Sequence, residues 1–345
     1  MREVLVEEAI AHARTREASD VYLCAGEPTA LLVGKKLYPQ ETTVSPDDLE
    51  RFLEACGIRD LSQPKQRLKN HGFCVVDHAD SAGTMRLTVT RPGGRYDVSI
   101  RLQGAEPPEL ESLGWPANIA EFAKLPKGLV VITGPGGSGK TSLLSGLVRR
   151  ILEVGGRPLW MLESPPEFRH AHRQGRVTQY SVGLDGDFPS YAHGVVAAMT
   201  ATVEVVVVGE ATEADVARAA LDAARLGKLV FVTMHAGNTV QALEQLATWG
   251  VSMTQLAQEI AGVVSLRLIP KLGGGLQPAA EMWLPDDASL ALIRSRDADL
   301  EGLRERIKSG HGMNTLESAL RMLWKGEKIT HEDAKRYAVK PGEVL

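Results

Sequence analysis

The sequence has few of the features that mark several other classes of protein. It contains only three cysteines in 345 residues, with no C-x-x-C pair, so neither a zinc module nor a dithiol redox motif is expected. Aromatic residues make up 5% of the chain and the formal net charge is −4, which argues against a nucleic-acid partner. No apolar run reaches the ~18 residues that a membrane span needs. We therefore expect a cytoplasmic protein without membrane insertion.

What the chain does contain is a complete phosphate-binding loop. Residues 134–141 read Gly-Pro-Gly-Gly-Ser-Gly-Lys-Thr, between an apolar run at 129–132 and a helical pattern at 143–152. Backbone N–H groups and the start of the helix favour phosphate there, Lys140 is expected to reach the β- and γ-phosphates, and Thr141 to hold Mg²⁺. We predict binding of ATP or GTP. The expected nucleotide-binding residues are Gly134, Gly136, Gly137, Ser138, Gly139, Lys140, Thr141 and Ser142.

The first hundred residues predict a mixed α+β domain, and the rest an α/β domain with a mainly parallel sheet. The expected boundaries are 1–103 for the first domain, 104–116 for a Pro- and Gly-containing linker, and 117–345 for the second, helical from about 287. In the first domain we expect helices near 4–16, 46–56 and 61–69, strands at 20–24, 30–33 and 73–76, and a hairpin of 85–91 with 95–102. In the second we expect strands at 128–133, 158–162, 177–180, 204–208 and 228–234, a short helix at 118–124, and a helix at 214–226 that begins with a Thr212/Asp215 capping box. An apolar helix beyond about 255 and a hairpin around 273–275 follow.

Three predicted strands of the second domain end on a reactive side chain. The three side chains are Glu163, Glu210 and His235. Ligands of parallel sheets bind beyond such strand ends. Glu210 is the candidate for polarising the attacking water, and the alternative is an acid that starts the next helix. Glu163 is the candidate for binding Mg²⁺ through water, or else a loop acid before two prolines. His235 is the candidate for contacting the γ-phosphate, or else a structural histidine.

The hairpin of the first domain carries arginines on the face opposite its apolar residues. If Leu87 pairs with Ile100, then Arg86 lies opposite Arg101, and directly opposed like charges are unfavourable. We interpret the pair as a partner for anions, such as the phosphates bound by a neighbouring subunit. The alternative is a solvated strand face.

These motifs together resemble the secretion-superfamily hexameric ATPases, and most of all the twitching-motility (PilT-like) motors that retract type IV pili. The resemblance runs nearly end to end. The matching segments are Ala18–Pro28, 126–134 with the phosphate loop, 162–168 at the family's acidic box, 208–210 at its Walker-B end, 227–235 at its histidine box, 312–316 and 329–334.

The resemblance implies a ring of subunits, each with a PAS-like N-terminal domain and a RecA-like ATPase domain. ATP would be held at subunit interfaces, with Lys140 and Thr141 on phosphate and Mg²⁺ and Glu210 acting on the water. Glu163 would support the metal, His235 would lie at the site, and Arg86 and Arg101 would complete it from the N-terminal domain. The implied partners are a homohexamer, an inner-membrane pilus platform protein and a paralogous motor, with the ring at the inner-membrane face of the pilus machine.

The sequence departs from the family pattern around the phosphates. Glu163 is followed by Ser164 instead of an acidic residue, the stretch 195–204 has no arginine, and Thr212 stands where the family has arginine. The retraction signature helix is present only in part, at 289–294. Because these changes remove secondary charges, we expect a slow ATPase or an accessory motor, with a turnover below the ~10 s⁻¹ median of enzymes.

Three other functions remain as alternatives. Assembly and type II secretion motors usually carry a further N-terminal domain and a four-cysteine zinc module, and the chain shows neither. A DotB-like motor of a conjugation-type secretion system would share all the motifs. A nucleotide-sensing scaffold with weak turnover would bind ATP in a way that Glu210→Gln does not change.

Overall fold

The computed structural model describes residues 1–34, 36–58, 72–80, 82–102, 106–164, 166–183, 186–294 and 298–344. The chain divides into two compact units, Met1–Glu106 and Pro107–Leu345. The helix expected at 61–69 lies outside the described residues. None of the helices in these ranges has both the length and the apolar character to cross a membrane.

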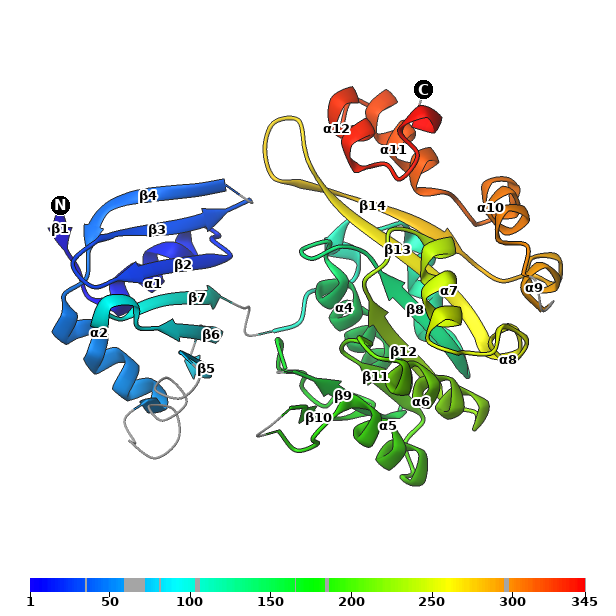
Figure 1. The fold of residues 1–345 in the computed structure, drawn as a ribbon, viewed down its shortest axis with the longest axis horizontal. Coiled ribbons are helices and arrows are strands. Elements are labelled where there is room, and N and C mark those ends of the chain that lie inside the picture. Colours follow the sequence, from blue (N-terminus) through cyan, green and yellow to red (C-terminus); the bar gives the residue numbers. More distant parts are fainter. Residues whose placement is uncertain are drawn as a thin grey trace. The chain divides into compact units, whose positions relative to one another are not determined.

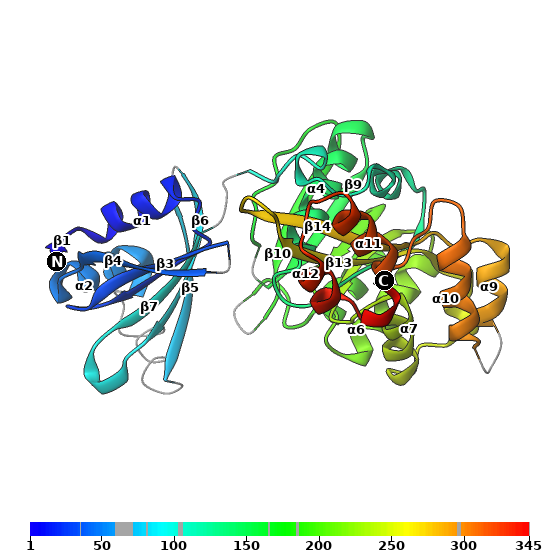
Figure 2. The ribbon, with the colours of Figure 1, turned by 90° about the horizontal axis from the view of Figure 1, so that it is seen from above.

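The first unit is a seven-stranded sheet in the order β1-β4-β3-β2-β7-β6-β5. Its helices α1 (Val6–Thr15) and α2 (Pro46–Leu53) bury their apolar sides in one core with the inward-facing residues of the sheet, and α1 lies along the sheet in Figures 1 and 2. The strands are β1 (Arg2–Glu3), β2 (Asp20–Cys24), β3 (Pro28–Val33), β4 (Lys36–Thr43), β5 (Phe73–Asp80), β6 (Gly83–Thr90) and β7 (Asp97–Leu102).

The register of the β6–β7 hairpin meets the condition on which the interpretation of the arginine pair depends. Leu87 pairs with Ile100, and Arg86 therefore stands opposite Arg101. The apolar face of both strands enters the core, since Leu87 and Ile100 are 0% exposed. The arginines consequently occupy the other face of the sheet.

The second unit is a seven-stranded sheet in the order β10-β9-β11-β12-β8-β13-β14, in which only β14 runs antiparallel to its neighbour. Because the sheet is covered on both faces, its strands β8, β11 and β12 are nearly continuous apolar runs. The strands are β8 (Gly128–Thr133), β9 (Pro158–Glu163), β10 (Arg176–Ser181), β11 (Val205–Val208), β12 (Leu229–Met234), β13 (Ile260–Pro270) and β14 (Leu276–Trp283).

The two faces of this sheet are covered by different helices. One face packs on a core that includes α5, α6, α7, α8, α9 and α10, and the other on α4 together with a 3₁₀ helix at Ala117–Lys124. Helices α11 and α12 form a smaller core with β13 and β14, beside β14 in Figure 1. The helices are α4 (Lys140–Val154), α5 (Tyr191–Thr200), α6 (Ala214–Arg225), α7 (Thr239–Thr248), α8 (Met253–Glu259), α9 (Asp287–Arg294), α10 (Leu300–Ser309), α11 (Leu316–Lys325) and α12 (His331–Tyr337).

Three of the differences from the expectation have a clear physical reason. Strand β4 was not expected, because Pro39 and its charges hide its alternation near the edge of the sheet. The apolar helix expected beyond 255 is confined to α8, and Ile260–Pro270 is a strand buried on both faces, whose run of apolar residues has no period to distinguish it from a helix. The prediction of a Thr212/Asp215 capping box is wrong, since the N-cap of α6 is Glu213 and no side chain caps this helix.

The segment expected as a linker packs partly against the second unit. Leu110 is 6% exposed and belongs to the core beneath α4, and Arg149 of α4 donates to the Pro107 carbonyl at 3.0 Å. Residues from Pro107 onward are therefore attached to that unit by side-chain contacts, and not only by the chain.

Candidate active site

The phosphate loop has an open, amide-lined tip. Gly137 has φ 66° and Gly139 has φ 94°, in the left-handed region that favours glycine. A Cβ added at Gly136 or Gly137 would meet nothing within 4 Å, so the space above the tip is free. Helix α4 starts directly after Gly139 and points its N-terminus toward this space. The conformation fits a bound phosphate group.

Two polar side chains of the loop lack the partners that an anion would supply. The Ser138 hydroxyl is buried and, within the described residues, has no hydrogen-bond partner. Among the residues that the structure describes, the Lys140 ammonium donates to two loop carbonyls and one ring nitrogen, at 2.7 Å to Gly134 O, 3.1 Å to Pro135 O and 3.3 Å to His235 Nδ1. Burial lowers the pKa of Lys140, against the opposing influence of Glu210. A phosphate near this ammonium would restore a favourable counter-charge.

Lys140, His235 and Glu210 form a continuous chain of contacts. His235 Nε2 lies 2.6 Å from Glu210 Oε1, and His235 Nδ1 faces the Lys140 ammonium. The sheet order explains this meeting, because β12, which leads to His235, lies between β8 and β11. Carboxyl ends of neighbouring parallel strands share one edge of the sheet.

The contacts of His235 with Lys140 and Glu210 also determine which of its ring nitrogens carries the proton. An ammonium can only donate, so Nδ1 of a neutral His235 accepts from Lys140, and Nε2–H donates to the Glu210 carboxylate. A protonated His235 would instead donate from Nδ1 to Gly134 O, 3.2 Å away. The Glu210 side chain keeps 36% of its surface exposed, which leaves room for a water molecule beside it.

Glu163 lies in different surroundings. It ends β9, which is separated from β8 by β11 and β12. Its side chain is 5% exposed and accepts a hydrogen bond of 3.1 Å from Gln179 Nε2. Burial, partly offset by this bond, raises the pKa of Glu163 to about 7. Within the described residues, the structure gives Glu163 no contact with Lys140, Glu210 or His235.

Gln179 is a site residue that the sequence analysis missed. Its amide donates to Glu163 and to Phe168 O at 2.7 Å, and its oxygen accepts from the His170 backbone at 2.9 Å. It therefore ties the loop after β9 to strand β10. The alternation of β10 placed a polar residue at this position, but only the pairing of β10 with β9 reveals what it contacts.

Arg267 is a second residue that the sequence analysis missed. It is 7% exposed in β13 and donates to Gly237 O at 2.7 Å, beside a 3.1 Å bond from Ser265 to the same carbonyl. Thr133 donates to Met234 O and Ala236 O, at 3.2 and 3.1 Å. These bonds hold the loop that carries His235. An arginine inside the apolar run 260–270 was the available signal.

The remaining predicted residues are divided between the two units. Thr141 and Ser142 lie half-buried in the first turn of α4. Arg101 of the first unit has a partner of its own, since its Nε lies 3.2 Å from the buried carboxylate of Asp20. The like charges of Arg86 and Arg101 are thus accompanied by a carboxylate on the same face.

Comparison with known proteins gives a consistent match over both units. The family model described as "Type II/IV secretion system protein" matches residues 97–299. The type IV pilus ATPase PilU of Pseudomonas aeruginosa is 27% identical over 329 residues, which cover 93% of this chain and 85% of that protein. The type IV pilus retraction ATPase PilT of the same organism is 25% identical over 347 residues, covering 97% and 98%.

A solved structure extends the similarity to the fold. The crystal structure of the pilus retraction motor PilT with bound ADP matches with a TM-score of 0.85 and 27% sequence identity, and covers 99% of this chain and 98% of that one. The expected fold class is confirmed: α/β, with a PAS-like α+β N-terminal part, a RecA-like part with a mainly parallel sheet, and a helical C-terminal region.

Proposed function

The chain belongs to the family of type II/IV secretion system proteins, and from that premise we propose that it is an ATP-hydrolysing motor that powers the retraction of type IV pili. The observation that carries the proposal is the convergence of Lys140, His235 and Glu210 at the open phosphate loop. The similarity to PilU and PilT over most of the chain supports the choice of pili as the cargo.

The phosphate loop binds the nucleotide in this proposal. Amides at Gly136 and Gly137 face the β-phosphate, and Lys140 leaves the carbonyls of Gly134 and Pro135 for the β- and γ-phosphates. The Thr141 hydroxyl, in the first turn of α4, is the protein ligand for Mg²⁺. When bound, the metal ion neutralises charge on the phosphates.

Glu210 is the catalytic base. Its carboxylate orients a water and accepts its proton as the water oxygen bonds to the γ-phosphorus and the bond to the β–γ bridging oxygen breaks, which yields ADP and phosphate. The Nε2–H of His235 holds one carboxylate oxygen, which leaves the other for the water. His235 also links this carboxylate to Lys140, so phosphate binding and water positioning are connected.

Glu163 contributes weakly to the metal site. Its carboxylate is buried against Gln179, and burial favours its protonated form near neutral pH. With Ser164 next to it, the box after β9 offers fewer charges to a hydrated Mg²⁺ than a pair of acids would. This supports slow turnover, as an accessory motor working beside a paralogue would have.

The active unit is a homohexamer in which Arg86 and Arg101 of one subunit reach the phosphates bound by the next. The support is their opposed register on the face of the sheet away from the core of the first unit. Arg101→Ala should lower ATP hydrolysis several-fold, and Arg51→Ala, at an exposed arginine of α2 that pairs with Asp48, should not. Unchanged hydrolysis in Arg101→Ala would remove this arginine from the site.

The motor acts in the cytoplasm at the inner-membrane face of the pilus machine, on a platform protein of that membrane. The direction of pilus movement is tested by deleting its gene in the host and counting surface pili. Loss of a retraction motor leaves more pili that are assembled but not withdrawn, so surface pili should increase and twitching should weaken, or stop where no paralogue retracts them. Cells without pili would instead indicate an assembly motor. A Lys140→Ala copy should fail to restore the wild-type phenotype.

A further inference from the structure

The segment Pro107–Trp115 follows α4 from its last turn back to the phosphate loop. It enters the second unit at Pro107, directly after the last residue of the first unit. Its contacts with α4 fall at three levels of the helix, near Arg149, Gly146 and Gly139. At Arg149 they are hydrogen bonds and an ion pair, and at Gly146 and Gly139 they are packing contacts.

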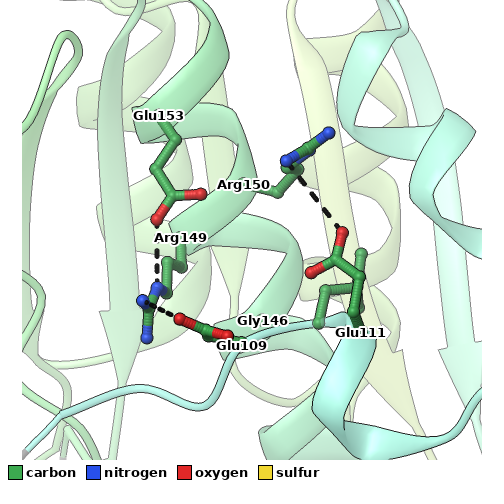
Figure 3. Close-up of a pocket in the computed structure, with 7 residues that line it drawn as sticks. Glu109, Glu111, Gly146, Arg149, Arg150 and Glu153 are labelled. Atoms are coloured by element: carbon green, nitrogen blue, oxygen red, sulfur yellow. Dashed lines mark hydrogen bonds and ion pairs between the residues drawn. The ribbon is translucent and has the colours of Figure 1, made fainter.

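At the far end of α4, the segment is held by charge. Arg149 donates to Pro107 O at 3.0 Å and to Glu109 at 2.8 Å, and a third bond of 3.0 Å to Glu153 fixes its guanidinium on the helix. Only 16% of the Arg149 side chain is exposed. Figure 3 shows Arg149 between Glu109 and Glu153, in a cavity of about 210 Å³. Its neighbour Arg150 makes a looser contact of 4.0 Å with Glu111 and is 39% exposed.

In the middle, the segment lies directly on the helix backbone. A Cβ at Gly146 would be 3.2 Å from Leu110 Cα and 3.3 Å from Leu113 Cδ1, which is closer than side chains normally pack. Glycine costs about 1 kcal/mol relative to alanine inside a helix. The approach of the segment gives a reason for its presence here.

At the near end, the segment reaches the phosphate loop itself. A 3₁₀ turn at Glu111–Leu113 ends on Gly114, whose φ of 69° redirects the chain toward Trp115. The Trp115 ring is 3.0 Å from the position of a Cβ on Gly139, and Leu268 is 3.4 Å from the same point. Gly139, the residue directly before Lys140, is therefore enclosed between Trp115 and Leu268.

We propose that Pro107–Trp115 is a strap that positions the phosphate loop, with Arg149 and Trp115 as its positioning residues. A displacement of the chain at Pro107 is passed along α4 to Gly139 and changes the affinity for nucleotide. The strap is the covalent continuation of the first unit, so it gives that unit a route to the nucleotide site within the same chain. The proposal rests on the proposed function only through nucleotide binding.

The first test follows the fluorescence of Trp115 while ADP with Mg²⁺ is titrated into the full chain. Calorimetry measures ADP binding independently. The chain has five tryptophans, so wild type is compared with Trp115→Phe and with a control, Trp324→Phe, whose ring stacks on His331 at 4.1 Å in the C-terminal helices. We expect the emission change on ADP binding to be lost in Trp115→Phe and kept in Trp324→Phe.

Two results would overturn the strap. An emission change that persists in Trp115→Phe, or no change in wild type that binds ADP by calorimetry, would separate Trp115 from the loop. Absence of ADP binding to the wild type would overturn the proposed function, and the strap with it.

The second test breaks the other end of the strap. Arg149→Ala should weaken ADP binding about tenfold, because small displacements at a positioned site cost up to about 100-fold. The control Arg150→Ala should stay within about twofold, since its exposed ion pair contributes little. Gly146→Ala places a methyl group against Leu110 and Leu113, so the segment must shift and ADP affinity should fall. Wild-type ADP affinity in Arg149→Ala and Gly146→Ala, or an equal loss in the control Arg150→Ala, would overturn the proposal.

Discussion

Glu210 and Glu163 both end parallel strands of one sheet, yet they differ in almost every physical respect. Glu210 is partly exposed, contacts His235 at 2.6 Å and is linked through it to Lys140. Glu163 is 5% exposed, contacts Gln179, and has its pKa raised to about 7 by burial. The difference follows from strand order. Strand β12, which leads to His235, lies between β11 and β8, so His235 stands between Glu210 and the phosphate loop. Strand β9, which ends on Glu163, lies on the far side of β11.

An acidic residue at the end of a parallel strand is therefore only a candidate for a catalytic role until the order of the strands is known. Strand β11 lies one position nearer to β8 than β9 does, and Glu210 after β11 reaches the phosphate loop through His235, which follows β12. We therefore expect substitutions on the side of Lys140 and His235 to impair catalysis, and substitution of Glu163 to act mainly on stability.

The largest effect is expected for Lys140→Ala. In the proposed function this ammonium faces the phosphates in both the bound state and the transition state, so kcat/KM for ATP should fall by about 1000-fold. Steady-state hydrolysis and ADP calorimetry measure it. The control Lys124→Ala removes an exposed lysine whose side chain is 56% accessible. Loss of activity in both variants would indicate a general effect of charge.

A smaller effect is expected for His235→Ala. It removes one charge-assisted hydrogen bond to the base, which contributes about 1.5 kcal/mol, so kcat should fall about tenfold while ADP affinity changes little. The exposed His311 supplies the matched control, His311→Ala. A His235→Ala variant with unchanged kcat would show that the contact with Glu210 has no catalytic role.

The smallest catalytic effect is expected for Glu163→Gln, which should lower kcat less than about threefold and change the pH dependence of stability instead. Burial raises the pKa of Glu163 from 4.5 to about 7. Between these values the folded chain retains a proton that the unfolded chain releases, so wild-type stability falls as pH rises through this window. The glutamine cannot titrate and escapes this loss.

The stability of Glu163→Gln relative to wild type should therefore increase between pH 4.5 and about 7 and level off above it, by up to about 3 kcal/mol. Urea unfolding without nucleotide or Mg²⁺ measures the free energy of unfolding. Taking the difference cancels other titrating groups, such as His170, whose pKa burial lowers to about 4. The exposed Glu213 gives the control Glu213→Gln. A flat difference across this window would contradict the buried, protonated Glu163.

Much of the fold was predictable from local patterns. The phosphate loop and the five strands from β8 to β12 followed from glycine spacing and apolar runs, and the β6–β7 register is one of those that alternation allowed. Strand β4 was missed because an edge strand with a proline has no clear alternation. The hairpin expected around 273–275 joins β13 to β14, but the full length of β13 was missed because burial on both faces removes the period on which such predictions depend.

The candidate site was predictable in its residues but not in its arrangement. The sequence supplied Lys140, Glu210 and His235, since each follows a strong strand signal. It could not rank Glu210 above Glu163 by position, because the order of parallel strands depends on crossover connections far longer than any local pattern. Contacts such as those of Gln179 and Trp115 depend on the same long-range packing.

The central claim is that Glu210, held through His235 beside Lys140, is the base for ATP hydrolysis in an assembled motor. The most direct test measures steady-state ATP hydrolysis by wild type and Glu210→Gln over protein concentrations that span assembly. We predict that specific activity of the wild type rises as the protein assembles, and that Glu210→Gln binds ATP but loses about 100-fold or more in kcat. ATP binding without turnover in both proteins, or equal turnover in both, would contradict the account.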